Sequence, residues 1–291
     1  MRITWLQDLD PLTEPGGAQL NDREKIVSGI RRGHDISIVL PTNYGKGAFN
    51  TDLVVVSNAT GFNMQVFRDL QESGADYMFF LHDYWPVCKV RLFYPMLAKC
   101  KTCYRKENWV PILAGAGLLV WLSPLHRKSW LYMCPELRRV PFAIIPSTVD
   151  PEMFYDMKLP RAGNVAVNSG VEFKGRYVFY KYAEDRPREQ FTLVGQADGR
   201  PPQNVKLVGQ VAYQGMNALY NSHETFVHLP ENPMPFDRTI VEALLAGCKV
   251  VSNKNVGALS WPEIMSGDKD GIKVLMKSAN SSFWAMAERV L

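Results

Sequence analysis

The chain has 291 residues, of which 46% are hydrophobic and 21% are charged, and its formal net charge is +4. This is an ordinary globular composition, so it excludes disordered, collagen-like and coiled-coil proteins. No run approaches the ~20 apolar residues that a membrane-spanning helix needs, and the N-terminal sequence lacks the basic and apolar regions of a secretory signal. We therefore expect a cytoplasmic protein without a transmembrane segment.

Short apolar runs bounded by turn residues recur through the first half of the chain. They predict β-strands at residues 2–6, 36–40, 53–56, 77–81, 118–122 and 142–145. Amphipathic, helix-like segments lie between several of these strands. Short buried strands that alternate with helices are typical of a parallel sheet covered on both faces.

A second series of strands follows a linking segment, residues 146–161. These strands are predicted at residues 165–167, 190–194, 206–208, 225–228 and 249–252, and the tail 283–291 is predicted to be helical. The sequence thus predicts an α/β protein with two Rossmann-like domains, residues 1–150 and 151–278, followed by a C-terminal helix at 279–291. We expect the carboxyl ends of the strands in the two parallel sheets to face each other across an inter-domain cleft. Ligands of open α/β sheets bind at the carboxyl ends of the strands, so the cleft is the expected binding site.

The positive charge is concentrated in one segment of the first half. Between Pro86 and Arg139, ten basic residues stand against two acidic ones, so this segment carries +8 and the rest of the chain −4. Seven aromatic residues are interleaved with the basic ones. A solvated basic face is one interpretation of this pattern, and a surface for an anionic partner is the other.

Five cysteines, an odd number, in a chain long enough to build its own core argue against a disulfide framework. Cys100 and Cys103 form a CxxC pair, and Cys88 precedes them. With Cys134 or a histidine as a fourth ligand, these residues would make a structural zinc site. Thiols without a metal are the default expectation.

Several short motifs follow one another along nearly the whole chain. They are PGGA at residues 15–18, HDYW at 82–85, SPLH at 123–126, IPSTVD at 145–150 followed by Phe154, FKG at 173–175, VG at 194–195, and PFDRTIVEA at 235–243 followed by AGC at 246–248. In this order they resemble family 4 of the nucleotide-sugar glycosyltransferases. The resemblance implies the GT-B fold, a retaining and metal-independent transfer, and no cofactor beyond the nucleotide-sugar donor.

The resemblance assigns the binding of the donor diphosphate to residues in both halves of the chain. Gly16 and Gly17 would offer backbone N–H groups to phosphate without obstruction by a Cβ atom, although a plain turn also explains them. Lys174 would be the cation for the diphosphate, or else a solvated lysine in a turn. Arg238 and Thr239 would add to the N-terminus of a helix at 240–246, whose dipole suits an anion.

Two further residues take roles from the resemblance. Glu242 would accept hydrogen bonds from the ribose hydroxyls of the nucleotide, the alternative being an exposed helical glutamate. His82 ends a buried strand and would act as the catalytic residue against the donor sugar, the alternative being a histidine of the core. The Asp8/Asp10 and Asp268/Asp270 pairs look like metal motifs, but we do not interpret them as metal sites.

The sequence departs from the family pattern at two positions. Ser169 stands where the family has an arginine five residues before the lysine, and Met234 stands where it has a glutamate that contacts the transferred sugar. These departures imply a different sugar, a compensating residue such as Glu231 or Asp237, or a protein that has lost transfer activity. We assign the sugar-binding position to Met234 and Asp237.

The resemblance places the acceptor in the first half of the chain, which holds the basic segment. We therefore expect transfer of a hexose from a UDP-sugar to a hydroxyl of an anionic acceptor: a glycan, a lipid-linked saccharide at a membrane periphery, or a 5-hydroxymethylated DNA base. The alternatives are a non-catalytic sugar-nucleotide or nucleic-acid binding protein on a degenerate GT-B fold, and an epimerase that needs no acceptor. The sequence does not give the oligomeric state.

Overall fold

The computed structural model describes residues 1–14, 16–45, 47–88, 91 and 106–291. The chain forms two compact units: unit 1 is Met1–Thr148 with Lys277–Leu291, and unit 2 is Val149–Met276. In the described residues, no helix combines the length and the apolar character that crossing a membrane requires.

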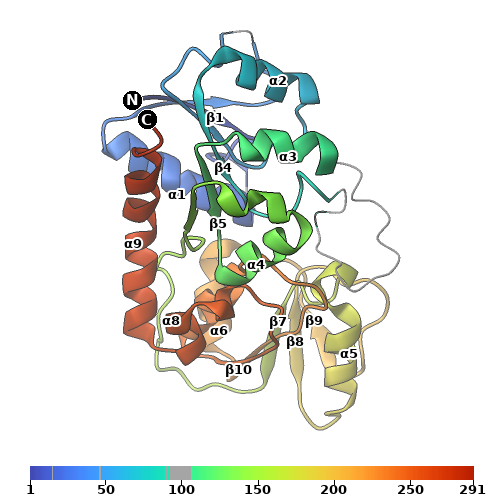
Figure 1. Cartoon of the computed structure of the whole chain (residues 1–291). Coiled ribbons are helices and arrows are strands. Elements are labelled where there is room, and N and C mark those ends of the chain that lie inside the picture. Colours follow the sequence, from blue (N-terminus) through green and yellow to red (C-terminus); the bar gives the residue numbers. More distant parts are fainter. Residues whose placement is uncertain (15, 46, 89–90, 92–105) are drawn as a thin grey trace. The chain divides into compact units, whose positions relative to one another are not determined.

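Unit 1 is built on a six-stranded parallel sheet (Figure 1). Its strands are β1 (Arg2–Leu6), β2 (Asp35–Val39), β3 (Leu53–Val56), β4 (Asp76–Phe80), β5 (Leu118–Trp121) and β6 (Phe142–Ile144). They lie in the order β2-β1-β3-β4-β5-β6, so β6 is an edge strand. The strand predictions for this half are confirmed, with each end within one residue of the predicted one.

Helices cover both faces of this sheet. They are α1 (Gly17–Arg31), α2 (Met64–Ser73), α3 (Lys106–Ala114), α4 (Pro124–Met133) with the 3-10 turn η1 (Pro135–Arg139), and the part of α9 (Lys269–Ala287) that belongs to this unit. On one face, Phe67 of α2, Trp109 of α3 and Trp85 pack together, with ring centroids 4.5–6.2 Å apart. On the other face, Trp284 of α9 packs against Trp5. Helix α9 begins earlier and ends sooner than the predicted helical tail.

The buried side chains of helix α1 are mainly polar, Ile26 being the apolar exception. Asn21, Asp22 and Lys25 are fully buried. Lys25 Nζ donates to Thr148 Oγ1 at 2.6 Å and to Asn280 Oδ1 at 2.7 Å. Thr148 ends the first segment of unit 1 and Asn280 lies near the start of its second segment, so Lys25 joins the two segments. Buried polar groups are tolerated when hydrogen-bonded, and these bonds replace the apolar stripe that α1 lacks.

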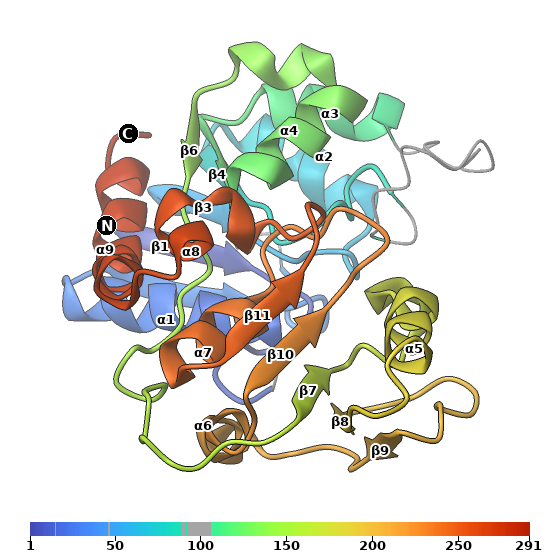
Figure 2. The same cartoon turned by 90° about the horizontal axis from the view of Figure 1, so that it is seen from below.

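Unit 2 is a five-stranded parallel sheet with helices on both faces (Figure 2). Its strands lie in the order β11-β10-β7-β8-β9, and their bounds are β7 Asn164–Val167, β8 Phe191–Val194, β9 Val205–Leu207, β10 Thr225–His228 and β11 Lys249–Ser252. Phe179 of α5 (Arg176–Glu184) packs on Phe191, whereas Tyr220 of α6 (Met216–Asn221) packs on Phe226 of β10. Helices α7 (Arg238–Ala246) and α8 (Pro262–Ser266) complete the unit. The strand predictions for the second half are confirmed too.

Candidate functional site

The largest group of predicted site residues lies at the carboxyl ends of β7 and β10 in unit 2. The turn η2 (Glu172–Lys174) follows β7 and carries Lys174. The loop after β10 leads to Asp237, the residue that precedes helix α7. Parallel strands end at one edge of a sheet, so residues that are far apart in sequence meet there.

Lys174 and Asp237 form an ion pair at this edge, and His228 joins them. Lys174 Nζ lies 2.9 Å from Asp237 Oδ1, and His228 Nε2 lies 3.0 Å from Asp237 Oδ2. Burial alone raises the pKa of Asp237, but the charges of Lys174 and His228 and their hydrogen bonds outweigh burial and bring it well below its usual range. Asp237 is therefore held as a carboxylate between two donors.

Ser169 extends this group. It is fully buried, and its Oγ lies 3.4 Å from Nδ1 of His228, the last residue of β10. Position 169 is an arginine in the family pattern. With a serine there, His228 is the second partner of Asp237. The site thus contains a histidine whose role the sequence did not suggest.

Helix α7 begins at Arg238, two residues earlier than predicted, because Asp237 turns the chain with a left-handed φ of 71°. The Asp237 side chain does not cap the helix, since both of its oxygens face Lys174 and His228. The first-turn N–H groups of α7 therefore lack that cap. A helix N-terminus of this kind favours an anion, and Lys174 lies beside it through its bond to Asp237.

Glu242 lies one turn into α7 and is 3% exposed. Its carboxylate accepts from the hydroxyls of Tyr213 (3.3 Å) and Tyr220 (3.1 Å), and Arg238 Nε lies 3.8 Å away. Burial raises the pKa of Glu242, and the charge of Arg238 and the tyrosine hydrogen bonds oppose this rise. Burial also raises the pKa of Tyr213 to about 12, so this tyrosine stays a donor.

The position of Lys174 depends on the glycine that follows it. Gly175 has a φ of 90°, and a Cβ atom placed there would lie 2.2 Å from the backbone oxygen of Leu229. A side chain at this point would collide with the chain that leaves β10. The turn can therefore approach β10 closely only with glycine.

The other residues predicted in unit 2 lie in different settings. The Met234 side chain is buried, and its backbone N donates to the oxygen of Asn255 while its oxygen accepts from Gly257 N. Thr239 is half-buried in the first turn of α7, and Glu231 is exposed. Met234 thus offers no carboxylate, and the nearest buried carboxylate in the sequence is that of Asp237.

His82, the predicted catalytic residue, lies in unit 1 directly after β4. Its Nε2 lies 2.8 Å from Oδ1 of the fully buried Asp22 on α1, and Ser57 Oγ donates to Asp22 Oδ2 at 2.7 Å. Both carboxylate oxygens thus accept a hydrogen bond, which places the proton of a neutral His82 on Nε2 and leaves Nδ1 as an acceptor. Asp22 orients this histidine, and no sequence motif pointed to it.

Gly16 and Gly17 also belong to unit 1. Gly16 precedes α1 with extended backbone, and Gly17 begins the helix. No side chain caps this helix end in the described residues. An added Cβ at Gly16 would meet only the flexible side chain of Gln19, so the backbone does not strictly require glycine there.

The possible metal motifs have other contacts where they are described. Asp8 accepts hydrogen bonds from the Thr60 side chain and from Thr60 N and Gly61 N, and Asp10 accepts from Leu12 N. Within the described ranges, no group of three or more His, Cys, Asp or Glu side chains is arranged to hold a metal.

The predicted zinc ligands are only partly described. Cys88 and Cys134 lie in the hydrophobic core of unit 1. Cys100 and Cys103 fall outside the described residues. The zinc site therefore stays a prediction.

Five of the residues in these groups were not found from the sequence: Asp22, Ser57, Tyr213, Tyr220 and His228. His228 did carry a signal, because it ends an apolar strand just as His82 does. Asp22 lies in a helix without an apolar stripe, and its pairing with His82 is a tertiary contact. The two tyrosines gave no local signal of their contact with Glu242.

The fold can now be compared with known structures. The chain has the GT-B fold, with two parallel α/β units that match glycosyltransferase structures along the whole chain. Sucrose-phosphate synthase from Thermosynechococcus elongatus aligns over 99% of this chain and 96% of its own, with a TM-score of 0.69 and 15% identity. Anabaena HepE in complex with UDP-glucose aligns over 100% and 98%, with a TM-score of 0.64 and 17% identity. Trehalose-6-phosphate synthase OtsA aligns over 100% and 94%, with a TM-score of 0.64 and 11% identity.

The TM-scores establish a common fold, and at these identities the similarity shows the fold alone. No protein-family model matches the sequence, and no curated protein sequence matches it significantly.

Proposed function

We propose that this protein is a glycosyltransferase that moves a sugar from a nucleoside-diphosphate sugar to a hydroxyl group of an acceptor. The proposed donor is a UDP-hexose and the proposed acceptor is anionic. The transfer proceeds with retention of anomeric configuration and without a metal, as the motif resemblance to family 4 implies.

The observation that carries the proposal is the grouping of Lys174 and Arg238 around the first turn of α7, at the carboxyl edge of the unit 2 sheet. A departing nucleoside diphosphate carries negative charge, which cations and a helix N-terminus stabilise. Glu242 lies farther along the same helix, with oxygens suited to accept from ribose hydroxyls. The similarity to HepE in complex with UDP-glucose supports a uridine donor.

The ion pair between Lys174 and Asp237 belongs to the site without donor. In the structure Lys174 is paired with Asp237 rather than with a phosphate. An incoming diphosphate would compete for Lys174, while His228 Nε2 would keep its contact with Asp237 Oδ2. The pair thus holds Lys174 near the helix end before the donor binds.

The first test is thermal unfolding with UDP, GDP, ADP and their glucose derivatives, because a ligand of the native state raises the unfolding temperature. We expect a selective rise with uridine compounds. Lys174→Ala and Glu242→Gln should each weaken donor binding about tenfold, which corresponds to about 1.4 kcal/mol. Lys181→Ala is the matched control, since Lys181 is exposed on α5 and pairs with Asp185.

Turnover then separates the proposal from its alternatives. Release of UDP that depends on acceptor and persists in EDTA supports a metal-independent transferase, and NMR of the product reports the anomeric configuration. Tight donor binding without turnover would point to a non-catalytic binding protein, and conversion of the donor sugar without acceptor would indicate an epimerase. Unchanged donor binding in both site variants would contradict the assignment of the site.

A further inference from the structure

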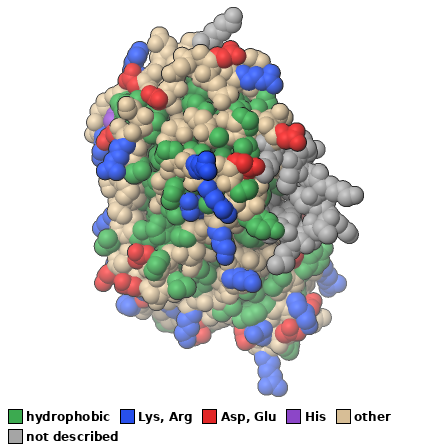
Figure 3. All heavy atoms as spheres, in the orientation of Figure 1, with side chains coloured by type: hydrophobic (Ala, Val, Ile, Leu, Met, Phe, Trp, Pro, Cys, Tyr) green, Lys and Arg blue, Asp and Glu red, His purple; other side chains and the backbone are tan. Residues whose placement is uncertain are grey.

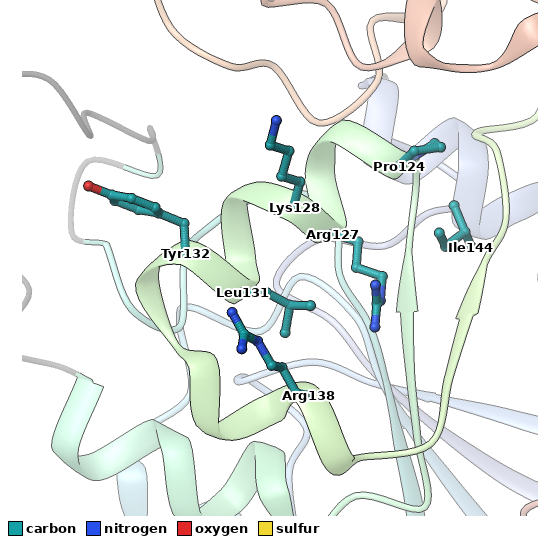
Figure 4. Close-up of a pocket in the computed structure, with 7 residues that line it drawn as sticks. All are labelled: Pro124, Arg127, Lys128, Leu131, Tyr132, Arg138 and Ile144. Carbon is teal, nitrogen blue, oxygen red and sulfur yellow. The ribbon is translucent and has the colours of Figure 1, made fainter.

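Unit 1 carries a shallow groove between helix α4, the turn η1 and the edge strand β6. Figure 4 shows the groove with its lining side chains, and its volume is about 400 Å³. The lining residues are Pro124, Arg127, Lys128, Leu131, Tyr132, Arg138 and Ile144. All belong to unit 1, and none is among the candidate site residues described above.

The groove is strongly basic. Arg127, Lys128 and Arg138 line it, and Arg139 is exposed beside it on η1. Within the described part of the chain, none of these four residues forms an ion pair, although Glu136 precedes the two arginines of η1. Figure 3 shows Lys and Arg side chains gathered with hydrophobic ones on this face of the protein. The described part of the +8 segment thus places four cations around one groove.

The groove also exposes apolar and aromatic surface. Tyr132 is 71% exposed and Phe142, at the start of β6, is 42% exposed. The guanidinium of Arg127 lies 3.9 Å from the centre of the Phe142 ring, so this cation covers an aromatic face rather than pairing with an acid. Leu131 and Ile144 add aliphatic surface. An aromatic ring beside aliphatic side chains and cations is the composition that suits a bilayer interface.

We propose that the α4–β6 groove is a docking surface for an anionic phospholipid bilayer. Four basic side chains that have no acidic partner among the described residues complement a negatively charged surface, and the apolar residues between them fit the boundary of headgroups and acyl chains. The protein would attach to the membrane from one side through unit 1. This surface goes beyond the proposed transferase activity and does not depend on it.

The arrangement of the cations distinguishes a membrane from a single bound phosphate. In Figure 4, Arg138 lies beside Leu131, and the charged ends of Arg127, Lys128 and Arg138 point in different directions rather than toward one place. Side chains that bind one phosphate converge on it. Cations spread around apolar side chains instead match a surface of many headgroups.

The same composition favours a membrane over a nucleic acid. Nucleic-acid interfaces are polar and track the phosphates of the backbone. The floor of this groove is instead aliphatic, and its cations surround that floor instead of forming a stripe.

The test is co-sedimentation of the full chain with vesicles of phosphatidylcholine containing 30% phosphatidylglycerol, compared with pure phosphatidylcholine. We expect binding to the anionic vesicles alone, and strong weakening in 0.5 M NaCl because salt screens surface charge. Each basic residue near an anionic surface contributes about fivefold, equivalent to about 1 kcal/mol. The double variant Lys128→Glu with Arg138→Glu should therefore lower the partition coefficient at least ~25-fold.

A matched control carries the same change in net charge elsewhere. Arg68 on α2 and Arg188 in unit 2 are exposed, and Arg68→Glu with Arg188→Glu should change vesicle binding less than about twofold. Tyr132→Ser keeps every charge and should still weaken binding, since it removes apolar contact. Thermal unfolding of each variant establishes that it is folded, and Lys128→Gln with Arg138→Gln replaces the charge reversal if that variant is unstable.

Three results would overturn the proposal: no binding to anionic vesicles, equal losses in the groove and control variants, or preferential binding of a DNA duplex at equal phosphate concentration through the same residues. The last result would make the groove a nucleic-acid interface. UDP release from donor is measured separately without vesicles. A protein that binds vesicles but never turns over donor would disprove the transferase and leave the docking surface standing.

Discussion

Asp22 in unit 1 and Asp237 in unit 2 have similar contacts: each is a buried carboxylate bonded to a histidine at the end of a β-strand. Asp22 contacts His82 at 2.8 Å, and Asp237 contacts His228 at 3.0 Å. A buried carboxylate is costly unless it is paired and hydrogen-bonded, and each of these accepts a second hydrogen bond, from Ser57 and Lys174 respectively. The pairing fixes which nitrogen of the histidine carries the proton.

If His82 acts on the donor sugar or acceptor, Asp22 acts through His82 as a positioning residue. His82→Gln should lower kcat about 100-fold, the low end of the contribution of a positioned proton-transfer group. Asp22→Asn keeps the shape of the side chain but no longer fixes which nitrogen of His82 carries the proton. It should therefore also lower kcat and shift the pH profile of kcat. Steady-state kinetics of both variants and of the double variant check this.

The double variant is the decisive member of that set. We expect it to be no slower than His82→Gln, because Asp22 has no route to the reaction except through the imidazole. Losses that multiply in the double variant would show that Asp22 has a separate role. Ser57→Ala serves as a control that removes the second hydrogen bond to Asp22 but leaves its contact with His82.

The sequence identified some residues of the unit 2 group and missed others for a physical reason. Lys174, Asp237, Arg238 and Glu242 belong to short motifs in which a turn or helix start is itself visible in the sequence. His228 and Tyr213 join them through contacts across the strand ends. Such contacts depend on which strands are neighbours, and local patterns do not contain this information.

At the level of elements, the turn after β7 shows how one backbone position places a functional side chain. Gly175→Ala adds a Cβ that collides with the Leu229 oxygen and strains a residue whose φ is 90°. We expect it to lower the free energy of unfolding by about 3 kcal/mol and to weaken donor binding, since Lys174 must move. Urea unfolding and donor titration measure the two effects.

Gly267→Ala is the matched control for that prediction. Gly267 follows α8 with a φ of 71°, but an added Cβ there meets no atom within 4 Å. It should cost only about 1 kcal/mol, the price of the left-handed backbone alone, and leave donor binding unchanged. Similar effects of the two substitutions would show that the collision at Gly175 is relieved at little cost.

The strands were predictable and the helices less so. Each strand of the two sheets is a short apolar run bounded by turn residues, because buried parallel strands are apolar on both faces. Helix α1 instead buries Asn21, Asp22 and Lys25, so its buried face has no apolar period to detect. Helix α9 begins at Lys269 in a polar stretch, well before the predicted tail.

For the whole molecule, the two units repeat one architecture but differ in what surrounds their strand ends. Unit 2 places cations and a helix N-terminus there. Unit 1 keeps a histidine and a polar helix face there, and the cations of its helix α4 and turn η1 form no ion pair with any described residue. The proposed donor chemistry therefore belongs to unit 2 and the proposed membrane contact to unit 1.

Buried titratable groups should limit the pH range in which the whole molecule is stable. Burial lowers the pKa of His126 to about 3. The unfolded chain therefore binds a proton here below pH ~6.5 while the folded chain does not. The contribution of His126 to stability is complete above that pH and declines as the pH falls toward 3. Burial raises the pKa of the Cys248 thiol to about 11, so stability declines as the pH rises above ~9, where the unfolded thiol ionises.

We expect the free energy of unfolding to be greatest between about pH 6.5 and 8.5 and to fall on each side, with each group contributing up to about 1.4 kcal/mol per pH unit within its window. Urea unfolding from pH 4 to pH 10.5 measures the profile. His126→Gln should reduce the slope of the acid side and leave the alkaline side unchanged, whereas Cys248→Ser should do the reverse. Because a lost packing contact lowers stability equally at every pH, only the change in slope reports the titration. Parallel profiles for wild type and His126→Gln below pH 6.5 would mean that this histidine is protonated in the folded protein.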